Sequence, residues 1–250
     1  MIGSLMVRHD PKESTLSEPK TAGPLARAVD RLQSKAFGLG PARNRYTVER
    51  GLEVPTRDGA LLVTDHYAPV TAGHGTVLVR SPYGRGVPES LFHGRMLAAR
   101  GYHVLVQSVR GTGGSTGEFR PIVQEAQDAQ DTVAWLRNRP WFDGRLATLG
   151  GSYLGWTQWA LLQDPPPELR ASVVIVAPHD FGRGIRGTGA LALADFLGWS
   201  ATVESQGSAG LKGIRALVAA RRRTAAALKK PGPIADAVAT APGRPGVVVR

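Results

Sequence analysis

The sequence predicts an α/β fold whose sheet is mostly parallel and flanked by helices. From residue 76 onward, short apolar runs alternate with segments of helical periodicity. Apolar runs without polar alternation are typical of strands that are buried on both faces of a parallel sheet. Strands that alternate with helices are joined by right-handed crossovers, which place the helices against the sheet.

The composition is that of a soluble globular protein. The chain has 250 residues, of which 42% are hydrophobic and 20% are charged, so it can bury a substantial core. The absence of cysteine excludes disulfides and thiolate metal sites. No apolar run reaches the ~18 residues of a membrane span, and the N-terminus lacks the long apolar segment of a secretory signal. We therefore expect a cytoplasmic protein without a membrane partner.

The positive charge raises the question of nucleic-acid binding. The formal net charge is +11, but most of the arginines are scattered along the chain. The one dense cluster, at residues 221–223 and 229–230, has no aromatic residues interleaved with it. A solvated basic face or tail is therefore favoured, and a nucleic-acid-associated protein stays as a weaker alternative.

Three segments follow one another along the chain. Residues 1–45 are polar and punctuated by prolines, with one short amphipathic helix at 25–37. Residues 46–180 contain the strands and helices of the α/β core. Residues 181–250 are rich in Ala, Leu and Gly, and we interpret them as a helical cap segment and a tail. The helical stretches of this last segment are 190–199 and 214–229.

The core begins with a hairpin and continues with buried strands. An Asp-Gly turn signal joins two runs of β-forming residues at 46–54 and 61–67. The buried strands are expected at 76–80, 103–107, 146–149 and 171–176. A helix at 91–100 ends at Gly101, a common C-terminal signal.

A second helix is expected at 124–138. Its apolar residues recur at steps of three and four, which places them on one face: Ala126, Ala129, Val133 and Leu136. Asp128 and Asp131 lie off that face, so we expect them to be solvated.

The glycine-rich loop at residues 110–117 follows a strand, as phosphate-binding loops do. A dinucleotide fingerprint needs its last glycine to open a helix, whereas Pro121 disfavours a helix at Arg120. The loop also lacks the Gly-Lys-Ser/Thr of a nucleotide-binding P-loop. Nucleotide binding is therefore not expected.

The strand at 146–149 runs into a motif typical of a nucleophile elbow. Gly150-Gly151 precede Ser152, and an apolar helical run follows. Small residues relieve the crowding of such a tight turn, and the helix N-terminus offers N–H groups to a developing oxyanion. The common pattern G-x-S-x-G is not met, because the second glycine is Gly155. A purely structural Gly-Gly-Ser turn is the alternative.

Four stretches together resemble the cocaine esterase and X-Pro dipeptidyl-peptidase family of serine hydrolases. They are R-D-G-A-L-L-V-T-D-H-Y from Arg57, V-R-S-P-Y-G-R from Val79, R-G-Y-H-V-L-V-Q-S-V-R-G-T-G-G-S-T-G-E-F from Arg100 and D-T-V-A-W-L-R-N-R-P-W-F-D-G-R-L-A-T-L-G-G-S-Y-L-G-W-T-Q-W from Asp131. The elbow of this family reads G-x-S-Y-x-G, which this chain meets. The resemblance covers roughly the middle 40% of the chain. It implies an α/β-hydrolase fold, incomplete at the C-terminus, with the beginning of a helical cap.

The resemblance also implies a chemistry. Ser152 would be the nucleophile that cleaves an ester or amide bond and forms an acyl-enzyme. The group transferred to Ser152 would be an acyl group or an X-Pro peptidyl group. The backbone N–H of Tyr153 and the phenolic O–H of Tyr83 would donate to the oxyanion. The alternative for Tyr83 is packing beside Pro82. No metal or organic cofactor is implied, and the partner would be a small-molecule ester or a short peptide. The choice among ester, X-Pro peptide and β-lactam-type substrates stays open, as does the oligomeric state.

Other residues of the matched stretches are expected to be structural. Arg110 and Ser115 belong to a family motif without an implied chemical role. Ser108 stands where the family usually has an acidic residue, which puts a hydrogen bond that anchors the loop in doubt.

A serine hydrolase needs a histidine base and an acid, and in α/β hydrolases the acid and then the histidine follow the serine along the chain. His179 is the only histidine after Ser152. We expect the chain to be the N-terminal part of a longer hydrolase, with the acid and base beyond its last residue. The alternatives are a rearranged site that uses His179 with Asp180, and a catalytically inactive relative that keeps the fold.

Overall fold

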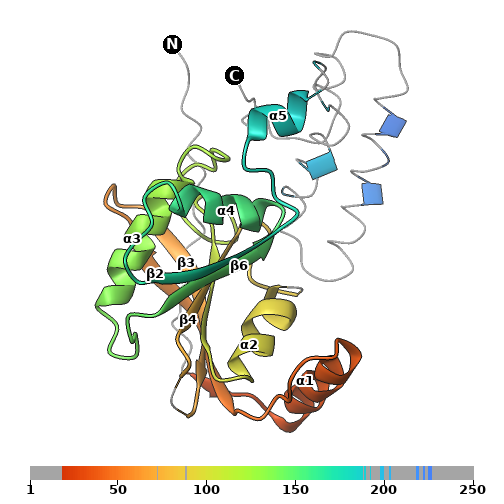
Figure 1. Ribbon diagram of the computed structural model, residues 1–250, viewed down its shortest axis with the longest axis vertical. Helices are drawn as coiled ribbons and strands as arrows, with labels where there is room; N and C mark the ends of the chain where they lie inside the picture. Colours follow the sequence, from red (N-terminus) through yellow and green to blue (C-terminus); the bar gives the residue numbers. More distant parts are fainter. Residues whose placement is uncertain are drawn as a thin grey trace.

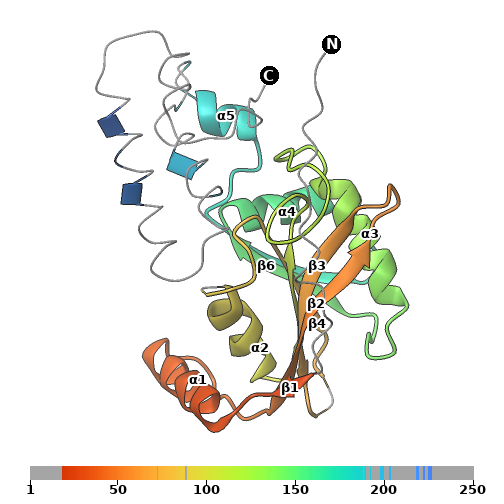
Figure 2. The same ribbon diagram turned by 180° about the vertical axis from the view of Figure 1, so that it is seen from behind.

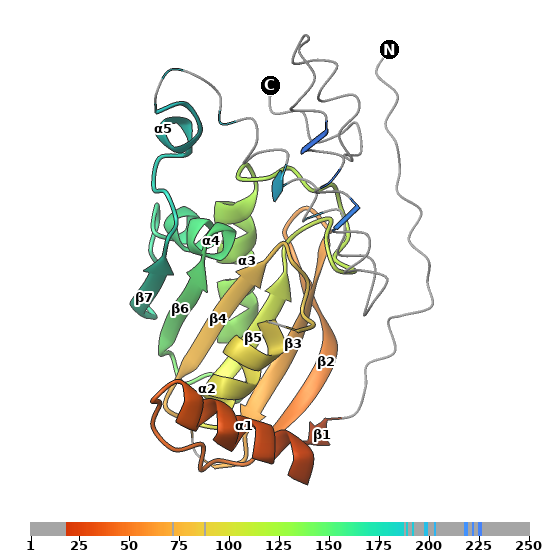
Figure 3. The ribbon, with the colours of Figure 1, turned by 90° about the vertical axis from the view of Figure 1, so that its right-hand side faces the viewer.

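A seven-stranded mixed sheet forms the centre of the protein. The computed structural model describes residues 19–187 except 72 and 88, together with residues 189, 192, 198, 199, 203, 218, 219, 222, 225 and 226. The strand order is β1-β2-β3-β5-β4-β6-β7 (Figure 3). The strands are β1 (Lys20–Thr21), β2 (Tyr46–Pro55), β3 (Leu61–Pro69), β4 (Thr76–Ser81), β5 (His103–Ser108), β6 (Leu146–Gly151) and β7 (Leu169–Ile175).

The α/β prediction is confirmed, and the sheet has an antiparallel half and a parallel half. β5, β4, β6 and β7 are neighbours and run parallel. The β2–β3 hairpin, expected from its Asp-Gly turn, joins the parallel half because β3 pairs antiparallel with β5. The short β1 adds to the outer edge of β2 and leads into the first helix (Figure 2).

The described part of the chain also contains helices, some of which cover the two faces of the sheet. They are α1 (Pro24–Ala36), the π-helix η1 (Ser90–Arg95) with its continuation α2 (Met96–Ala98), α3 (Glu125–Arg137), α4 (Tyr153–Leu161) and α5 (Phe181–Arg186). The single helix expected at 91–100 is therefore partly a π-helix. α2 and α3 lie on opposite sides of the sheet (Figure 3).

The core is divided by the sheet because side chains alternate along a strand. Val77 and Val79 of β4 face Ala98 at the end of α2. Leu78, between them, faces the opposite cluster with Val133 of α3. Because consecutive apolar side chains of β4 point to opposite faces, the sheet lies between two apolar layers.

The amphipathic helix expected at 25–37 is confirmed as α1, but its polar side faces the protein. Asp30 is buried, where it accepts a hydrogen bond from the Tyr46 hydroxyl at 2.9 Å and pairs with Arg95 at 2.9 Å. Leu25 and Leu32 are 80% and 69% exposed. The ion pair and hydrogen bond thus orient the helix against the expectation from its apolar stripe.

The prediction that Asp128 and Asp131 are solvated is wrong. Both carboxylates are buried on α3. Asp128 pairs with Arg110 at 2.6 Å, and Asp131 pairs with Arg57 at 2.8 Å. The periodicity of α3 shows its apolar face, but the hairpin turn and the loop after β5 bring arginines to the other face.

The segment predicted to form a cap, residues 181–250, is described mainly at its start. α5 follows β7 at the same end of the sheet as the elbow (Figure 1). The helices expected at 190–199 and 214–229, the basic cluster and the tail lie largely or wholly outside the described residues. The division of the chain near residues 45 and 180 stays a prediction. Among the described helices, none has both the length and the apolar character that crossing a bilayer requires.

Candidate active site

Ser152 stands at the end of β6 in a strained backbone conformation. Its φ is 56° and its ψ is −123°, and Ile122 and Val176 are the other described non-glycine residues with positive φ. A non-glycine residue held in such a region costs about 1–3 kcal/mol. Its side chain is exposed, at the point where the strand turns sharply into α4. This is the geometry of a nucleophile elbow.

Two glycines make this turn possible by close approach. A Cβ atom on Gly150 would lie 2.3 Å from Leu154 Cβ, and one on Gly155 would lie 2.4 Å from Ala177 Cβ. Real Cβ atoms do not come so close, so α4 packs against β6 and the segment after β7 through glycine. The close approach falls three residues after Ser152, which explains why the second glycine is Gly155 and not residue 154.

A free backbone donor lies beside the serine. The amide N–H of Tyr153 has no acceptor among the described residues, and it opens α4. The Ser152 amide, in contrast, donates to the Ile175 carbonyl at 2.9 Å, which ties the turn to β7. Free N–H groups at a helix N-terminus favour negative charge. The geometry therefore suits an oxyanion beside Ser152.

Tyr83 lies half-buried after β4. Its amide donates to the Ser81 hydroxyl at 2.9 Å, which shapes the turn after the strand. Its hydroxyl accepts a hydrogen bond from the Trp199 indole at 3.1 Å, and that indole also stacks on Tyr153, with ring centroids 5.6 Å apart. Trp199 thus connects the two tyrosines to which the resemblance gives oxyanion roles. Sequence reasoning assigned Trp199 only to a helix.

His179 and Asp180 do not join Ser152. The His179 ring lies edge-on to Trp159, with centroids 6.4 Å apart. The Asp180 carboxylate accepts a hydrogen bond from the Arg183 amide at 2.9 Å and caps α5. No side chain among the described residues hydrogen-bonds to the Ser152 hydroxyl. The rearranged site considered from the sequence is therefore not formed.

The glycine-rich loop is anchored by side chains. Arg85 donates to the Ser108 hydroxyl at 2.7 Å and to the Gly113 carbonyl at 2.5 Å, so Ser108 still supports the loop in place of an acid. The Ser115 hydroxyl donates to the Ser108 carbonyl at 2.8 Å and accepts from the Val63 amide at 2.8 Å. These contacts confirm the structural role expected for Ser115.

The sequence pattern of the X-Pro dipeptidyl-peptidase (S15) family matches residues 58–240, which is most of the chain and includes the elbow. The chain belongs to this family.

The chain is also similar to individual proteins. Cocaine esterase from Rhodococcus sp. (strain MB1 Bresler) is 36% identical over 169 residues, which are 63% of this chain and 29% of the esterase. An aminopeptidase from a marine sediment Thaumarchaeota archaeon has 28% identity and a TM-score of 0.54, covering 64% of this chain and 30% of that one. An α-amino acid ester hydrolase has 26% identity and a TM-score of 0.53, covering 65% and 30%. The chain thus spans about 30% of the length of these relatives.

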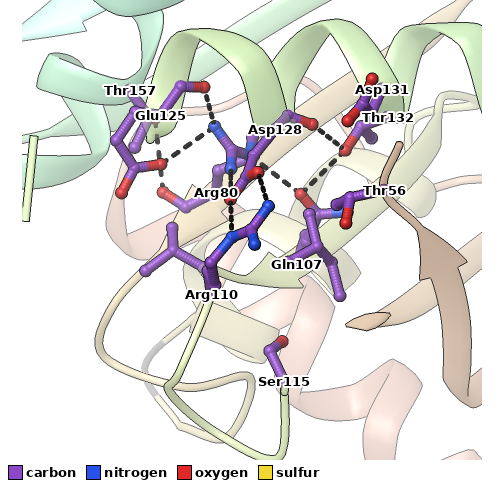
Figure 4. Close-up of polar contacts among 12 residues, drawn as sticks. Thr56, Arg80, Gln107, Arg110, Ser115, Glu125, Asp128, Asp131, Thr132 and Thr157 are labelled. Carbon is purple, nitrogen blue, oxygen red and sulfur yellow. Dashed lines mark hydrogen bonds and ion pairs between the residues drawn. The ribbon is translucent and has the colours of Figure 1, made fainter. Parts of the chain in front are cut away.

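A buried polar network joins the start of α3 to β4, β5 and the loop after β5 (Figure 4). Glu125, at the start of α3, pairs with Arg80 of β4 at 3.0 Å and accepts a hydrogen bond from the Tyr153 hydroxyl at 2.7 Å. All three side chains are buried. Burial raises the pKa of Glu125, although the Arg80 guanidinium opposes this shift. Burial and the Glu125 charge raise the pKa of the Tyr153 hydroxyl well above its ordinary value.

The network continues to the hairpin turn. Arg110 holds Asp128 through two hydrogen bonds, at 2.6 and 3.1 Å, and Asp58 through two more, at 2.7 and 3.0 Å. This confirms that Arg110 is structural. Sequence reasoning did not find the network, although an arginine within an apolar strand, as at Arg80, signals a buried partner.

Proposed function

We propose that this S15-family chain carries the nucleophile and the oxyanion donors of a serine hydrolase that cleaves ester or amide bonds. The backbone of Ser152 is the observation that carries the proposal. A strained, exposed serine between a strand and a helix N-terminus has no structural advantage at that position, whereas a nucleophile needs both exposure and a neighbouring N–H donor.

In the proposed reaction the Ser152 Oγ attacks the carbonyl carbon of the substrate, and its proton passes to a general base. The carbonyl oxygen becomes an oxyanion, which accepts hydrogen bonds from the Tyr153 N–H and the Tyr83 O–H. Collapse of this intermediate breaks the bond to the alcohol or amine, which leaves with the proton from the base. Water, activated by the same base, then releases the acid from Ser152.

The base is proposed to come from outside the described residues. His179 lies against Trp159 and does not reach Ser152 by a hydrogen bond. The relatives are about three times as long as the matched region, so a longer protein has room for the acid and the histidine. We propose a small-molecule ester or a short peptide as substrate, because the matched relatives are an esterase, an amino acid ester hydrolase and an aminopeptidase.

Labelling with a fluorophosphonate probe tests the proposal on the 250-residue chain. Labelling is expected to disappear in Ser152→Ala. Tyr83→Phe should slow labelling by roughly 10²–10³-fold if its hydroxyl is an oxyanion donor. Tyr102→Phe is the matched control, because Tyr102 is also a half-buried tyrosine beside the same core cluster but contacts His74.

Added imidazole distinguishes a missing base from an inactive serine. If wild type is labelled only with imidazole, the elbow is competent and the base is absent from this chain. If a folded wild type is labelled under neither condition, the proposal is wrong. The protein is then a catalytically inactive relative, the alternative that the position of His179 favours.

A further inference from the structure

We infer that Glu125 is a positioning residue that holds the two proposed oxyanion donors in one rigid frame. The inference rests on the proposed function, because it concerns the donors Tyr153 and Tyr83. It goes beyond that function because Glu125 touches neither the nucleophile nor the substrate. Glu125 acts on the two donors through two contacts, one with the phenol hydroxyl of Tyr153 and one with the guanidinium of Arg80.

The first link is the side chain of Tyr153. Its hydroxyl donates to Glu125 Oε1 at 2.7 Å and accepts from the Ile122 amide at 2.9 Å. Tyr153 is 4% exposed, so its ring is packed along its length as well as held at its end. A tyrosine side chain has few rotatable bonds. Holding the hydroxyl therefore restricts the Tyr153 backbone, whose N–H is the proposed donor.

The second link is the ion pair with Arg80. Glu125 Oε2 lies 3.0 Å from the guanidinium, and the Glu125 backbone carbonyl accepts from the same nitrogen at 2.8 Å. The Arg80 Nε also donates to the Gln107 side chain at 2.8 Å, which fixes the guanidinium between β4 and β5. Arg80 precedes Tyr83, which lies in the turn after β4, by three residues. One carboxylate therefore touches the strand that leads to one donor and the residue that contains the other.

A role in stability alone does not account for this arrangement. Glu125 is 3% exposed and Arg80 is also 3% exposed, so both charges have lost their hydration. Buried ion pairs are often matched or exceeded in stability by apolar residues of similar size. What apolar residues cannot supply is a directed hydrogen bond to the Tyr153 hydroxyl. Ile122, which provides the other hydrogen bond, has a φ of 77°, so the loop accepts strain to make this contact.

Glu125→Gln is the first test, because glutamine keeps the size of the side chain, removes the charge that pairs with Arg80 and leaves the Tyr153 hydroxyl only a weaker, neutral acceptor. The maximal labelling rate of Ser152 by the fluorophosphonate is expected to fall by ~10–100-fold, since displacement of a donor by about 1 Å has effects of this size. The concentration of probe that gives half-maximal rate should stay unchanged, because the lost interaction acts only on the transition state. Asp131→Asn is the matched control. It removes another buried carboxylate of α3, one that pairs with Arg57.

Tyr153→Phe is the second test and replaces the first if Glu125→Gln folds poorly, because it removes the hydroxyl that Glu125 binds. It should also lower the labelling rate, and adding Glu125→Gln to it should lower the rate by less than Glu125→Gln does in wild type, because only the link through Arg80 is then left to lose. A purely structural role predicts that the two losses are independent, and that Asp131→Asn lowers the rate as much as Glu125→Gln at equal loss of thermal stability. Either result would overturn the inference.

A structural readout separates this inference from the proposed function. The backbone amide resonances of Ser152 and Tyr153 are expected to move in Glu125→Gln and to stay in place in Asp131→Asn. This measurement needs only a folded chain. If wild type is not labelled at all, the proposed function fails while the amide shifts still decide whether Glu125 positions the elbow. Unchanged amide shifts in Glu125→Gln would refute the positioning role.

Discussion

Replacing Ser152 with glycine is expected to stabilise the protein, because Ser152 is held at a φ of 56° and a ψ of −123°. Glycine reaches such regions without a steric penalty. The strain relieved is about 1–3 kcal/mol, and the larger entropy of glycine in the unfolded chain offsets about 0.4–1 kcal/mol of it. The net gain in the free energy of unfolding is therefore about 1 kcal/mol, or about 2–4 °C in Tm for a chain of this size.

The comparison is between Ser152→Gly and Ser152→Ala in thermal and urea unfolding. Both variants lack the hydroxyl, so the difference in stability between them reports the backbone. Ser152 is exposed, which makes the contacts of the alanine methyl group small.

A control pair at Gln163 should give the opposite sign. Gln163 is exposed in the turn after α4, and it is not among the residues with positive φ. Gln163→Gly is therefore expected to be about 0.4–1 kcal/mol less stable than Gln163→Ala. If Ser152→Gly is no more stable than Ser152→Ala while the control pair behaves as expected, the backbone conformation of Ser152 does not cost free energy and the reasoning is refuted.

Three further predictions concern packing and pH. Gly155→Ala is expected to lower the free energy of unfolding by about 1–3 kcal/mol, because its new methyl group would overlap Ala177, and unchanged urea unfolding would contradict this packing. Burial lowers the pKa of His66 to about 3, so the unfolded chain takes up the proton first and stability falls as pH drops below 6.5. This amounts to about 2 kcal/mol between pH 7 and 5, and it should vanish in His66→Phe, which retains a ring to stack on Trp141. Burial raises the pKa of Glu89 to about 7. The folded protein therefore holds this proton more tightly than the unfolded chain, and the free energy of unfolding falls as pH rises from 4.5 through 7. Glu89→Gln should therefore be more stable than wild type at pH 8, by up to about 3 kcal/mol, and equal to it at pH 4; a constant difference at both pH values would refute this assignment.

The sequence by itself determined the order of elements and the position of the elbow. Apolar runs such as residues 77–79 of β4 and 104–106 of β5 can be buried only between two layers, and alternation with helices makes that part of the sheet parallel. The spacing of glycines around Ser152 indicates a tight turn, because close approach of backbones excludes side chains whatever the rest of the fold is. These are local properties, and the residues that show them are neighbours in the chain.

The tertiary structure alone decided which polar groups are buried and what they touch. Periodicity identifies the apolar face of α3, but it is silent about the partner that covers the other face. Arg57 reaches Asp131 across 74 residues of sequence, and Tyr153 reaches Glu125 across 28. Such contacts form because folding brings distant strands and loops together, and their charges are stable in the interior only as pairs. The strain at Ser152 and the orientation of α1 arise in the same way, from the packing of segments that the chain keeps apart.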